Sequence, residues 1–595
     1  MKKRLLLVFS ISVVLALSGC KKHASSSEFS SSSEIPNNTS ATNIPSISVP
    51  DPTNVDEPTI SGDFSLVNAS NTSVTGVNNV YTITGAGTYT ASGVLNGQIV
   101  INATDNDKVI LVLNGLSISN NTDSPIKAIN ADNFTINVKD NTENLVKDLR
   151  NTKTVDNEAV GEGAINSKVD LKIKGSGLLV VEGNYNNGIH TSDDLEIQAA
   201  TIKSTGYNNA FKGNDSVEIS SGTLYAISKN GQGIKTKNSD ISSKGNQRGD
   251  ITINGGYIYV DSVYDALDAS YNVNINEANT STPTVITIKT GDNATYKANY
   301  DKSSSAKGIK AENNININGG YITLAASDDA VHANYGETLE NGSKGLGNVN
   351  IAGGTLLIAS GDDAIHADNT LTISGGQTVI SGSYEGLEAN HIVISGGSTY
   401  VYGRDDGLNA SKKINETPTI EVSGGFLDIS VANGDTDAID SNGSFTQTGG
   451  TIISRGSPGV RGSNMSTALD CDGTATISGG TFIAFNGMEK TPSISNSVYK
   501  AATSNANSGG GGFPGGGPGG GPNGPRPYLA LPDSYEAGDY KVSGEGIDIS
   551  FSNNYQYGSF MIYSSLLKLN SAYTLTKDTN TLLSWTQSSS SVTIS

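Results

Sequence analysis

Two short stretches of the chain carry side chains that could bind a metal ion or catalyse a reaction. Asp-Asp-Ala-Val-His-Ala occupies residues 328–333, and Asp-Asp-Ala-Ile-His-Ala occupies residues 362–367. Each stretch places carboxylates and one imidazole close together in sequence, and both groups are common metal ligands. The stretches are either two separate sites or two copies of one repeating unit, and the surrounding sequence decides between these interpretations.

Both stretches belong to a repeat that runs through most of the chain. Each copy has a small residue, an apolar residue, a polar residue and usually another small residue, as in Ala364-Ile365-His366-Ala367. Many copies lie about 22 residues apart, with longer intervals elsewhere, and glycine pairs such as Gly375-Gly376 recur between them. This pattern predicts an all-β fold, a parallel β-helix of about 22-residue coils with three short strands each. A propeller needs a steadier period, and a leucine-rich repeat needs a regular leucine pattern.

The repeat changes the interpretation of the two histidines. The apolar residue of each unit must face the core, so strand alternation points the next side chain outward. Stacked coils then place His332 and His366 about 4.8 Å apart in one outward column. Zinc sites use about three or four ligands, mostly nitrogen or sulfur, whereas the whole chain has five histidines and two cysteines. We therefore interpret the two histidines as polar column residues rather than zinc ligands or a general base.

The turn before this column carries acidic residues in successive coils. Two like charges about 5 Å apart repel by roughly 0.8 kcal/mol in water and by about 3 kcal/mol at an effective dielectric of about 20. Calcium, with about six to eight oxygen ligands, would relieve this repulsion; solvated turn aspartates are the alternative. The predicted calcium ligands are Asp328, Asp329, Asp362, Asp363, Glu385, Asp405, Asp406 and Asp437.

Tyrosines recur beside the same turns and on nearby strands. A tyrosine ring can pack on the face of a sugar while its hydroxyl group stays hydrated. Filling of cross-strand ladders is an equally good explanation for any single tyrosine. The residues predicted to contact carbohydrate are Tyr259, Tyr264, Tyr384, Tyr402, His332 and His366.

The overall charge restricts the partners. With 58 acidic and 38 basic residues, the net charge of −20 argues against nucleic acid and against an anionic membrane surface. It suits cations, or neutral ligands bound through polar and aromatic groups. An acidic polymer would need bridging cations or local basic patches.

The N-terminus predicts secretion and lipid attachment. Basic residues at positions 2–4 precede an apolar run over 5–17, which is typical of a secretory signal rather than a membrane span. The ending Leu17-Ser18-Gly19-Cys20 resembles a bacterial lipobox, which implies a lipid on Cys20; an ordinary signal peptide is the alternative. Only Cys471 remains besides it, so no intrachain disulfide is expected in the mature protein.

Composition divides the chain into five parts. Ser, Thr, Asn and Pro dominate the segment after the signal, and a Gly/Pro-rich stretch interrupts the chain near its C-terminus. The predicted parts are a signal peptide over 1–20, a disordered linker over 21–60, the β-helix over 61–505, a Gly/Pro-rich linker over 506–527 and a small C-terminal β module over 528–595.

The chain resembles the bacterial cell-surface carbohydrate-binding β-helix family, which is related in fold to pectate lyases and includes members that bind cellulose and acidic pectin. The resemblance covers roughly residues 80–500 and is most specific at 108–118, 124–126 and 140–144, with further matches in the repeat units and at 482–487. It implies a right-handed helix, calcium between coils at the turn carboxylates, and C-terminal strands that close the helix.

Two main functions are open at this point. The first is non-catalytic, calcium-dependent binding of cellulose or an acidic pectin-like glycan by a monomer that is lipid-anchored to the bacterial cell membrane and faces outward. The second is a polysaccharide lyase, which needs a base near a sugar C5 proton and a cation beside the uronate. Lys310 and Arg404 are candidate bases, but outward lysines recur at Lys212 and Lys235, so binding is favoured. A surface adhesin is a third possibility.

Overall fold

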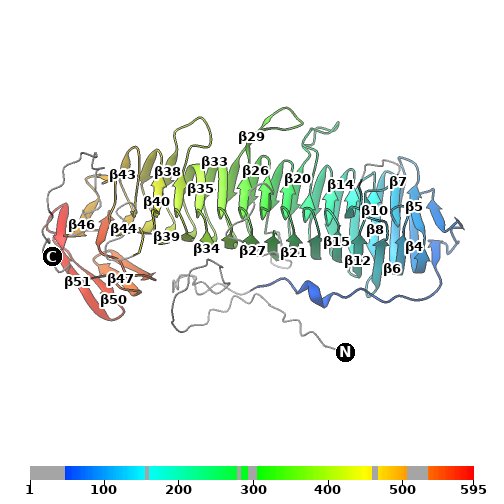
Figure 1. Cartoon of the computed structure of the whole chain (residues 1–595), viewed down its shortest axis with the longest axis horizontal. Helices are drawn as coiled ribbons and strands as arrows, with labels where there is room; N and C mark the ends of the chain where they lie inside the picture. The colour runs from blue at the N-terminus through cyan, green and yellow to red at the C-terminus, as the bar shows by residue number, and fades with distance from the viewer. Residues whose placement is uncertain are drawn as a thin grey trace, which may run out of the picture.

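The computed structural model describes residues 47–154, 160–277, 283–291, 305–458, 467–504 and 534–594. Regular structure in these residues is all β, apart from the 3-10 turn η1 (Pro52–Asn54). The strands stack in chain order along one long axis (Figure 1). No helix in this part of the chain is long and apolar enough to span a membrane.

Most strands pair in parallel with a strand of the next turn of the chain, which produces three faces. Along the first face, β10 (Gly163–Ser167) pairs with β13 (Asn187–Thr191), and β13 pairs with β16 (Phe211–Gly213). The other strands of the first face are β3 (Val80–Ile83), β5 (Gln98–Asn102), β7 (Ile126–Asn130), β19 (Ile234–Lys235), β22 (Leu267–Ala269), β25 (Ile309–Ala311), β28 (Val331–Ala333), β33 (Ile365–Ile373), β35 (Leu387–Ile394), β37 (Leu408–Ala410) and β40 (Ile439–Ser441).

The second face follows the first after a short corner. The long strands β33 and β35 continue into it, and β6 (Lys108–Asn120) contributes its first half. Its other strands are β8 (Asn133–Val138), β11 (Leu171–Gly175), β14 (Asp194–Gln198), β17 (Ser216–Ile219), β20 (Asp250–Ile253), β23 (Asn272–Ile275), β26 (Asn314–Ile317), β31 (Asn348–Ile351), β38 (Thr419–Val422), β41 (Ser444–Gln447), β43 (Ala475–Ile477) and β45 (Ser493–Ile494).

The third face completes each turn of the chain. The second half of β6 belongs to this face, because it pairs with β9. The strands are β4 (Gly87–Asn96), β9 (Glu143–Asp148), β12 (Leu178–Gly183), β15 (Thr201–Gly206), β18 (Thr223–Ser228), β21 (Gly256–Ser262), β24 (Thr284–Thr290), β27 (Tyr321–Ala326), β32 (Thr355–Ser360), β34 (Gln377–Ser383), β36 (Ser398–Gly403), β39 (Phe426–Val431), β42 (Thr451–Arg455) and β44 (Thr481–Phe485). The fold is therefore all-β with a mostly parallel sheet, consistent with a β-helix.

One continuous apolar core fills the space between the faces. The apolar residue of each repeat unit lies in it: Val331 pairs with Ile365, Ile365 pairs with Leu387, and all three are fully buried. Burial of each such side chain contributes about 1.5–3 kcal/mol. The prediction that these residues face the core, and that the following residue points away from it, is confirmed.

Glycine pairs make the corner between the second and third faces. Gly397, the second glycine of its pair, has φ of 76°, and a Cβ atom there would lie 2.7 Å from the carbonyl oxygen of Gly375 in the neighbouring turn of the chain. Only glycine combines this backbone angle with so close an approach. On the second face, Asn316 Nδ2 donates to Asn274 Oδ1 (2.9 Å) and Asn350 Nδ2 donates to Asn316 Oδ1 (3.0 Å), which links successive strands.

Two regions add to this regular part. At the N-terminal end, β1 (Ser65–Asn68) pairs antiparallel with β4, and β2 (Gly76–Val77) pairs with β3. Between β28 and β31, the hairpin of β29 (Tyr335–Thr338) and β30 (Lys344–Leu346) projects from the stack (Figure 1).

The C-terminal strands are partly integrated into the stack. β49 (Phe560–Ser564) pairs antiparallel with both β44 and β46 (Tyr499–Thr503), and β52 (Ser591–Ile594) pairs with β46. The remaining strands, β47 (Gly538–Gly544), β48 (Ile547–Asn553), β50 (Ala572–Lys577) and β51 (Asn580–Thr586), form an antiparallel sheet. The predicted signal peptide, Cys20 and the Gly/Pro-rich linker over 506–527 lie outside the described residues.

Candidate metal and carbohydrate site

The polar residues that follow the buried apolar ones form one column along the first face. His332 pairs with His366, His366 with Glu388, and Glu388 with Asn409. This is the register that the repeat predicts. In chain order the column is Lys127, Asn166, His190, Lys212, Lys235, Asp268, Lys310, His332, His366, Glu388, Asn409 and Asp440.

The column is not the open surface that strand alternation alone suggests. His366 is 8% exposed and Glu388 is 5% exposed. One reason is that two turn carboxylates fold back over the column: Asp329 and Asp363 reach the histidines three positions later. The turn residues are consequently buried too, with Asp328, Asp329, Asp363 and Glu385 all less than one tenth exposed, so they are not solvated turn residues.

The two histidines stack and are surrounded by carboxylates. Their ring centroids lie 4.3 Å apart with an interplanar angle of 5°. Asp329 Oδ2 lies 2.6 Å from His332 Nδ1. Around His366, Asp363 Oδ2 and Glu388 Oε2 lie 2.9 and 2.8 Å from Nδ1, and Asp368 Oδ1 lies 3.2 Å from Nε2.

The two imidazoles have opposite electrostatic environments. Burial alone would lower the pKa of His366. Hydrogen bonds to Asp363, Asp368 and Glu388 outweigh this effect and raise the pKa well above its ordinary value. Burial lowers the pKa of His332, and the positive charge of His366 adds to this effect. His366 is therefore the cation of the pair, and it neutralises part of the carboxylate ladder.

Lysines neutralise more of the ladder. Lys307 Nζ lies 2.9 Å from Asp328 Oδ2 and 2.8 Å from Asp329 Oδ2, and Lys413 Nζ lies 2.5 Å from Glu388 Oε1. These cations thus offset part of the repulsion expected between the carboxylates, but burial and then Asp363 and Glu388 still raise the pKa of Glu385 to about 9. Potential ligand atoms still gather here within 4.8 Å of one another, in the groups Asp328–Asp329–Asp362, Asp329–His332–His366 and Asp363–His366–Glu388.

Repulsion between acids does dominate further along the column. Burial raises the pKa of Asp406 to about 8, and the negative charges of Asp440 and Asp405 contribute to this shift. Burial and then Asp470 and Asp440 raise the pKa of Asp437 to about 7. Burial and then Asp470 raise that of Asp440 to about 6. These shifts mark a half-buried acidic stretch that favours any added positive charge.

Two unsatisfied oxygen atoms lie at the start of this stretch. Asn409 Nδ2 donates to Glu385 Oε1 at 2.8 Å. Glu385 Oε2 and Asn409 Oδ1 are both buried and have no hydrogen-bond partner within the part of the chain that the structure describes. A buried acceptor without a partner is costly. Carboxylate and amide oxygens are the donors that calcium prefers, so each of these two oxygens is chemically suited to calcium.

The predicted carbohydrate-contacting tyrosines do not form one cluster. Tyr264 and Tyr384 lie in turns beside the first face, and Tyr384 is 44% exposed. Tyr259 and Tyr402 lie on strands β21 and β36 of the third face and are half-buried. The Tyr259 hydroxyl group donates to Asp261 Oδ2 (3.3 Å), and Tyr402 lines a shallow pocket next to Tyr555.

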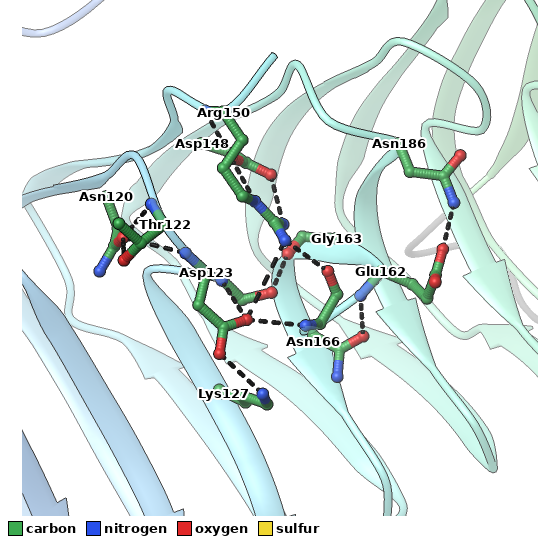
Figure 2. Close-up of polar contacts among 12 residues, drawn as sticks. Asn120, Thr122, Asp123, Lys127, Asp148, Arg150, Glu162, Gly163, Asn166 and Asn186 are labelled. Atoms are coloured by element: carbon green, nitrogen blue, oxygen red, sulfur yellow. Dashed lines mark hydrogen bonds and ion pairs between the residues drawn. The ribbon is translucent and has the colours of Figure 1, made fainter. Parts of the chain in front are cut away.

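A charged network at the N-terminal end of the column was not predicted (Figure 2). Arg150 Nε and Nη2 donate to the two carboxylate oxygens of Asp148 (2.9 and 2.6 Å), and Nη1 donates to the Gly161 carbonyl oxygen (2.8 Å). The guanidinium group also lies 4.0 Å from the centre of the Tyr185 ring. Asp123 beside it binds Lys127 Nζ at 2.7 Å. Arg150 lies outside the repeat unit, so periodicity carries no signal for it, whereas Lys307 occupies the turn position that Asp329 has in the next coil.

Fold and site together define an all-β protein whose parallel stack carries a long polar column rich in carboxylates. Residues 77–347 match a family model described as "Carbohydrate-binding domain-containing protein". The resemblance predicted from the sequence is thereby confirmed for this part of the chain. The match ends before the stretch from 362 onward, where the unsatisfied oxygens lie.

Two similar proteins define the comparison further. A carbohydrate-binding domain-containing protein of Acetivibrio thermocellus is 38% identical over 122 residues, which are 20% of this chain and 43% of the relative. The chain therefore spans less than half the length of that curated relative. A solved structure of a polysaccharide lyase-like protein from C. thermocellum, a gadolinium derivative, is 30% identical and covers 39% of this chain and 92% of its own, with a TM-score of 0.32.

Proposed function

We propose that the protein binds a polysaccharide without cleaving it, that binding depends on calcium, and that it takes place at the bacterial cell surface. The carbohydrate-binding family match and the curated relative support polysaccharide binding in general. The observation that carries calcium dependence is the buried pair of unsatisfied oxygens, Glu385 Oε2 and Asn409 Oδ1, beside the acidic stretch. The glycan is cellulose or an acidic pectin-like polymer.

Calcium would be held by Glu385, Asn409 and the carboxylates of Asp406, Asp437 and Asp440. It would neutralise their mutual repulsion and could bridge to uronate groups of an acidic glycan. Such a bridge would overcome the repulsion that a net charge of −20 imposes on an acidic polymer. The carboxylates of Asp328 and Asp329 are less suitable, because Lys307 already occupies the position of a cation.

Three finer features complete the proposal. The mostly parallel stack is a right-handed parallel β-helix with coils of about 22 residues, closed by the C-terminal strands. The mature chain starts at Cys20, whose lipid anchors the protein to the outer side of the cell membrane. The protein acts as a monomer.

Affinity electrophoresis in gels that contain cellulose, pectate or xylan tests this function. We expect retardation in at least one gel, stronger with calcium than with chelator. Asp406→Asn should weaken the calcium effect, whereas Asp548→Asn, which alters an exposed carboxylate of the C-terminal sheet, should leave it unchanged. Absence of retardation in every gel would contradict the proposal.

A lyase remains the second candidate because of one lysine. Lys310 does not suit the role of base. Burial alone would lower its pKa, but the negative charges of Asp268 and Glu312 raise the pKa above the ordinary value. Arg404 donates to the carbonyl oxygens of Ser383 and Gly361. Burial lowers the pKa of Lys212, in contrast, to about 8, and the positive charges of Lys235 and Lys237 contribute to this shift. An amine that is partly neutral near pH 8 can accept a proton.

Polygalacturonate digestion separates the two functions. We expect no unsaturated uronate products from the unaltered protein between pH 6 and pH 9, because the favoured function is binding alone. Product formation that rises as the pH passes about 8, is lost in Lys212→Ala and persists in Lys310→Ala would establish the lyase instead.

A further inference from the structure

Residues 47–58, which we call the strap, run along the third face and include the 3-10 turn η1 (Figure 1). Val49 is 8% exposed and packs with Tyr225 and Val285 in a small apolar cluster separate from the main core. Tyr225 and Val285 point away from the core, yet they are 2% and 1% exposed. The prediction of a disordered linker over 21–60 therefore differs from the structure for this segment.

The strap is held by side chains and carbonyl groups rather than by a strand ladder. Lys203 Nζ donates to the carbonyl oxygens of Pro52 (3.2 Å) and Val55 (2.6 Å), and Lys147 Nζ lies 2.8 Å from Glu57 Oε2. Residues 47–60 contain η1 but no strand. Prolines at 50, 52 and 58 remove backbone donors that a ladder would need. The strap can therefore leave the face without breaking any sheet hydrogen bond.

Beneath the strap lies a strip of aromatic and basic side chains. Lys203, Tyr225 and Tyr259 follow one another on successive strands, about 4.8 Å apart. Tyr257 and Tyr321 flank Val285 in the adjacent column. Lys289 Nζ lies 5.4 Å from the centre of the Tyr259 ring. Tyrosine rings in a row suit sugar faces, and the lysines suit carboxylates.

The chemistry of the strap indicates what the strip prefers. The strap contains Asp51, Asp56 and Glu57 and no basic residue. Two of its acids interact with lysines of this face. Glu57 pairs with Lys147, and the pKa of Asp51 is lowered by two hydrogen bonds from Thr53 and then by the charge of Lys289. The strip thus holds a narrow extended chain that carries carboxylates along its length, in a protein that is acidic overall.

We propose that this strip, formed by Lys203, Tyr225, Tyr257, Tyr259, Lys289 and Tyr321, is a binding site for an acidic polysaccharide chain, and that the strap occupies it in competition with that chain. The inference rests on the proposed function and deepens it, because it assigns a uronate-containing glycan to a face distinct from the carboxylate column. Binding of glycan displaces the strap, and the docked strap lowers the apparent affinity.

Releasing the strap in the full chain tests the competition. The variant Val49→Ser/Val55→Ser removes the apolar contacts of the strap, and Val77→Ser, at a side chain 75% exposed on β2, is the matched control. Affinity electrophoresis in polygalacturonate at one fixed calcium concentration should show about tenfold tighter binding for the double variant, as expected if the strap covers the strip in about nine molecules of ten. Adding Tyr259→Ala should remove this gain.

Hydrogen exchange on the unaltered protein provides a second measurement that does not depend on any variant folding correctly. Polygalacturonate should speed amide exchange in residues 47–57, because the bound glycan displaces the strap from the third face. If the parent is retarded but the double variant gains nothing and exchange in the strap is unchanged or slower, the competition is refuted while polysaccharide binding stands. If no protein is retarded, the proposed function fails as well.

Discussion

Replacing Arg150 with alanine should lower the free energy of unfolding by about 3–5 kcal/mol, since one partner of a buried ion pair is removed. The Asp148 side chain is fully buried and the Arg150 side chain is 6% exposed. Without the guanidinium group, the Asp148 carboxylate loses both of its bidentate hydrogen bonds and the Gly161 carbonyl group loses a donor. Tyr185 loses the cation above its ring.

Chemical denaturation and hydrogen exchange of β9 and β10 would measure this loss. Arg150→Lys should restore little of it, because an ammonium group cannot bond both oxygens of Asp148 in the planar geometry of guanidinium. The double variant Asp148→Ala/Arg150→Ala should lose less than the two single variants together, since no unpaired charge stays buried. Lys568→Ala breaks an exposed ion pair with Glu545 and should leave stability unchanged. A stability change in Arg150→Ala no larger than in Lys568→Ala would show that the network contributes nothing.

The elements that sequence reasoning could predict are those repeated in every turn of the chain. The unit around Ile365 recurs often enough to define which side chain faces the core and which side chains stack, and the observed register follows it. Gly375-Gly376 pairs mark a corner because close backbone approach excludes a Cβ atom. Periodicity is reliable here because each coil must bury the same apolar position against its neighbours.

The burial of the site could not be predicted in the same way. It depends on contacts between side chains on neighbouring coils, such as Lys307 with Asp328 and Lys413 with Glu388, and the repeat does not specify how each coil's side chains pair with those of the next. The sequence therefore indicated repulsion along the whole carboxylate ladder, whereas in the structure these lysines offset part of it. The orphaned oxygen of Asn409 was missed for a related reason, because the column was interpreted by charge rather than by hydrogen-bond capacity.

The strap shows a different limit. Residues 47–58 have the Pro-rich, acidic composition of a linker, and two valines are the main apolar side chains that hold it. Composition describes what a segment can bury alone, not what a preformed face offers to it. The row of tyrosines on β18, β21 and β27 supplies that face, and its members lie far from the strap in sequence.

Removal of calcium should destabilise the protein more strongly as the pH rises. In the absence of the ion, Asp406, Asp437 and Asp440 have folded-state pKa values of about 8, 7 and 6, above the ordinary 3.8. The folded state then binds more protons than the unfolded state, so the stabilisation from the protonated carboxyl groups is fully present below about pH 4 and is lost as the pH rises through 6 to 8. His366 acts in the same direction, since its pKa is also raised.

Thermal melts of the full chain in chelator and in excess calcium, from pH 5 to pH 8.5, measure this dependence. In chelator the melting temperature should fall steadily across the range; with calcium it should stay nearly level, because the ion neutralises the ionised carboxylates and binds only the folded site. The gap between the two curves should therefore widen with pH, to at least a few degrees at pH 8. Asp406→Asn should flatten the chelator curve and shrink the gap, whereas Asp548→Asn should change neither. Identical curves with and without chelator at pH 8 would instead mean that these carboxylates are tolerated without a metal, and calcium dependence of binding would lose its structural basis.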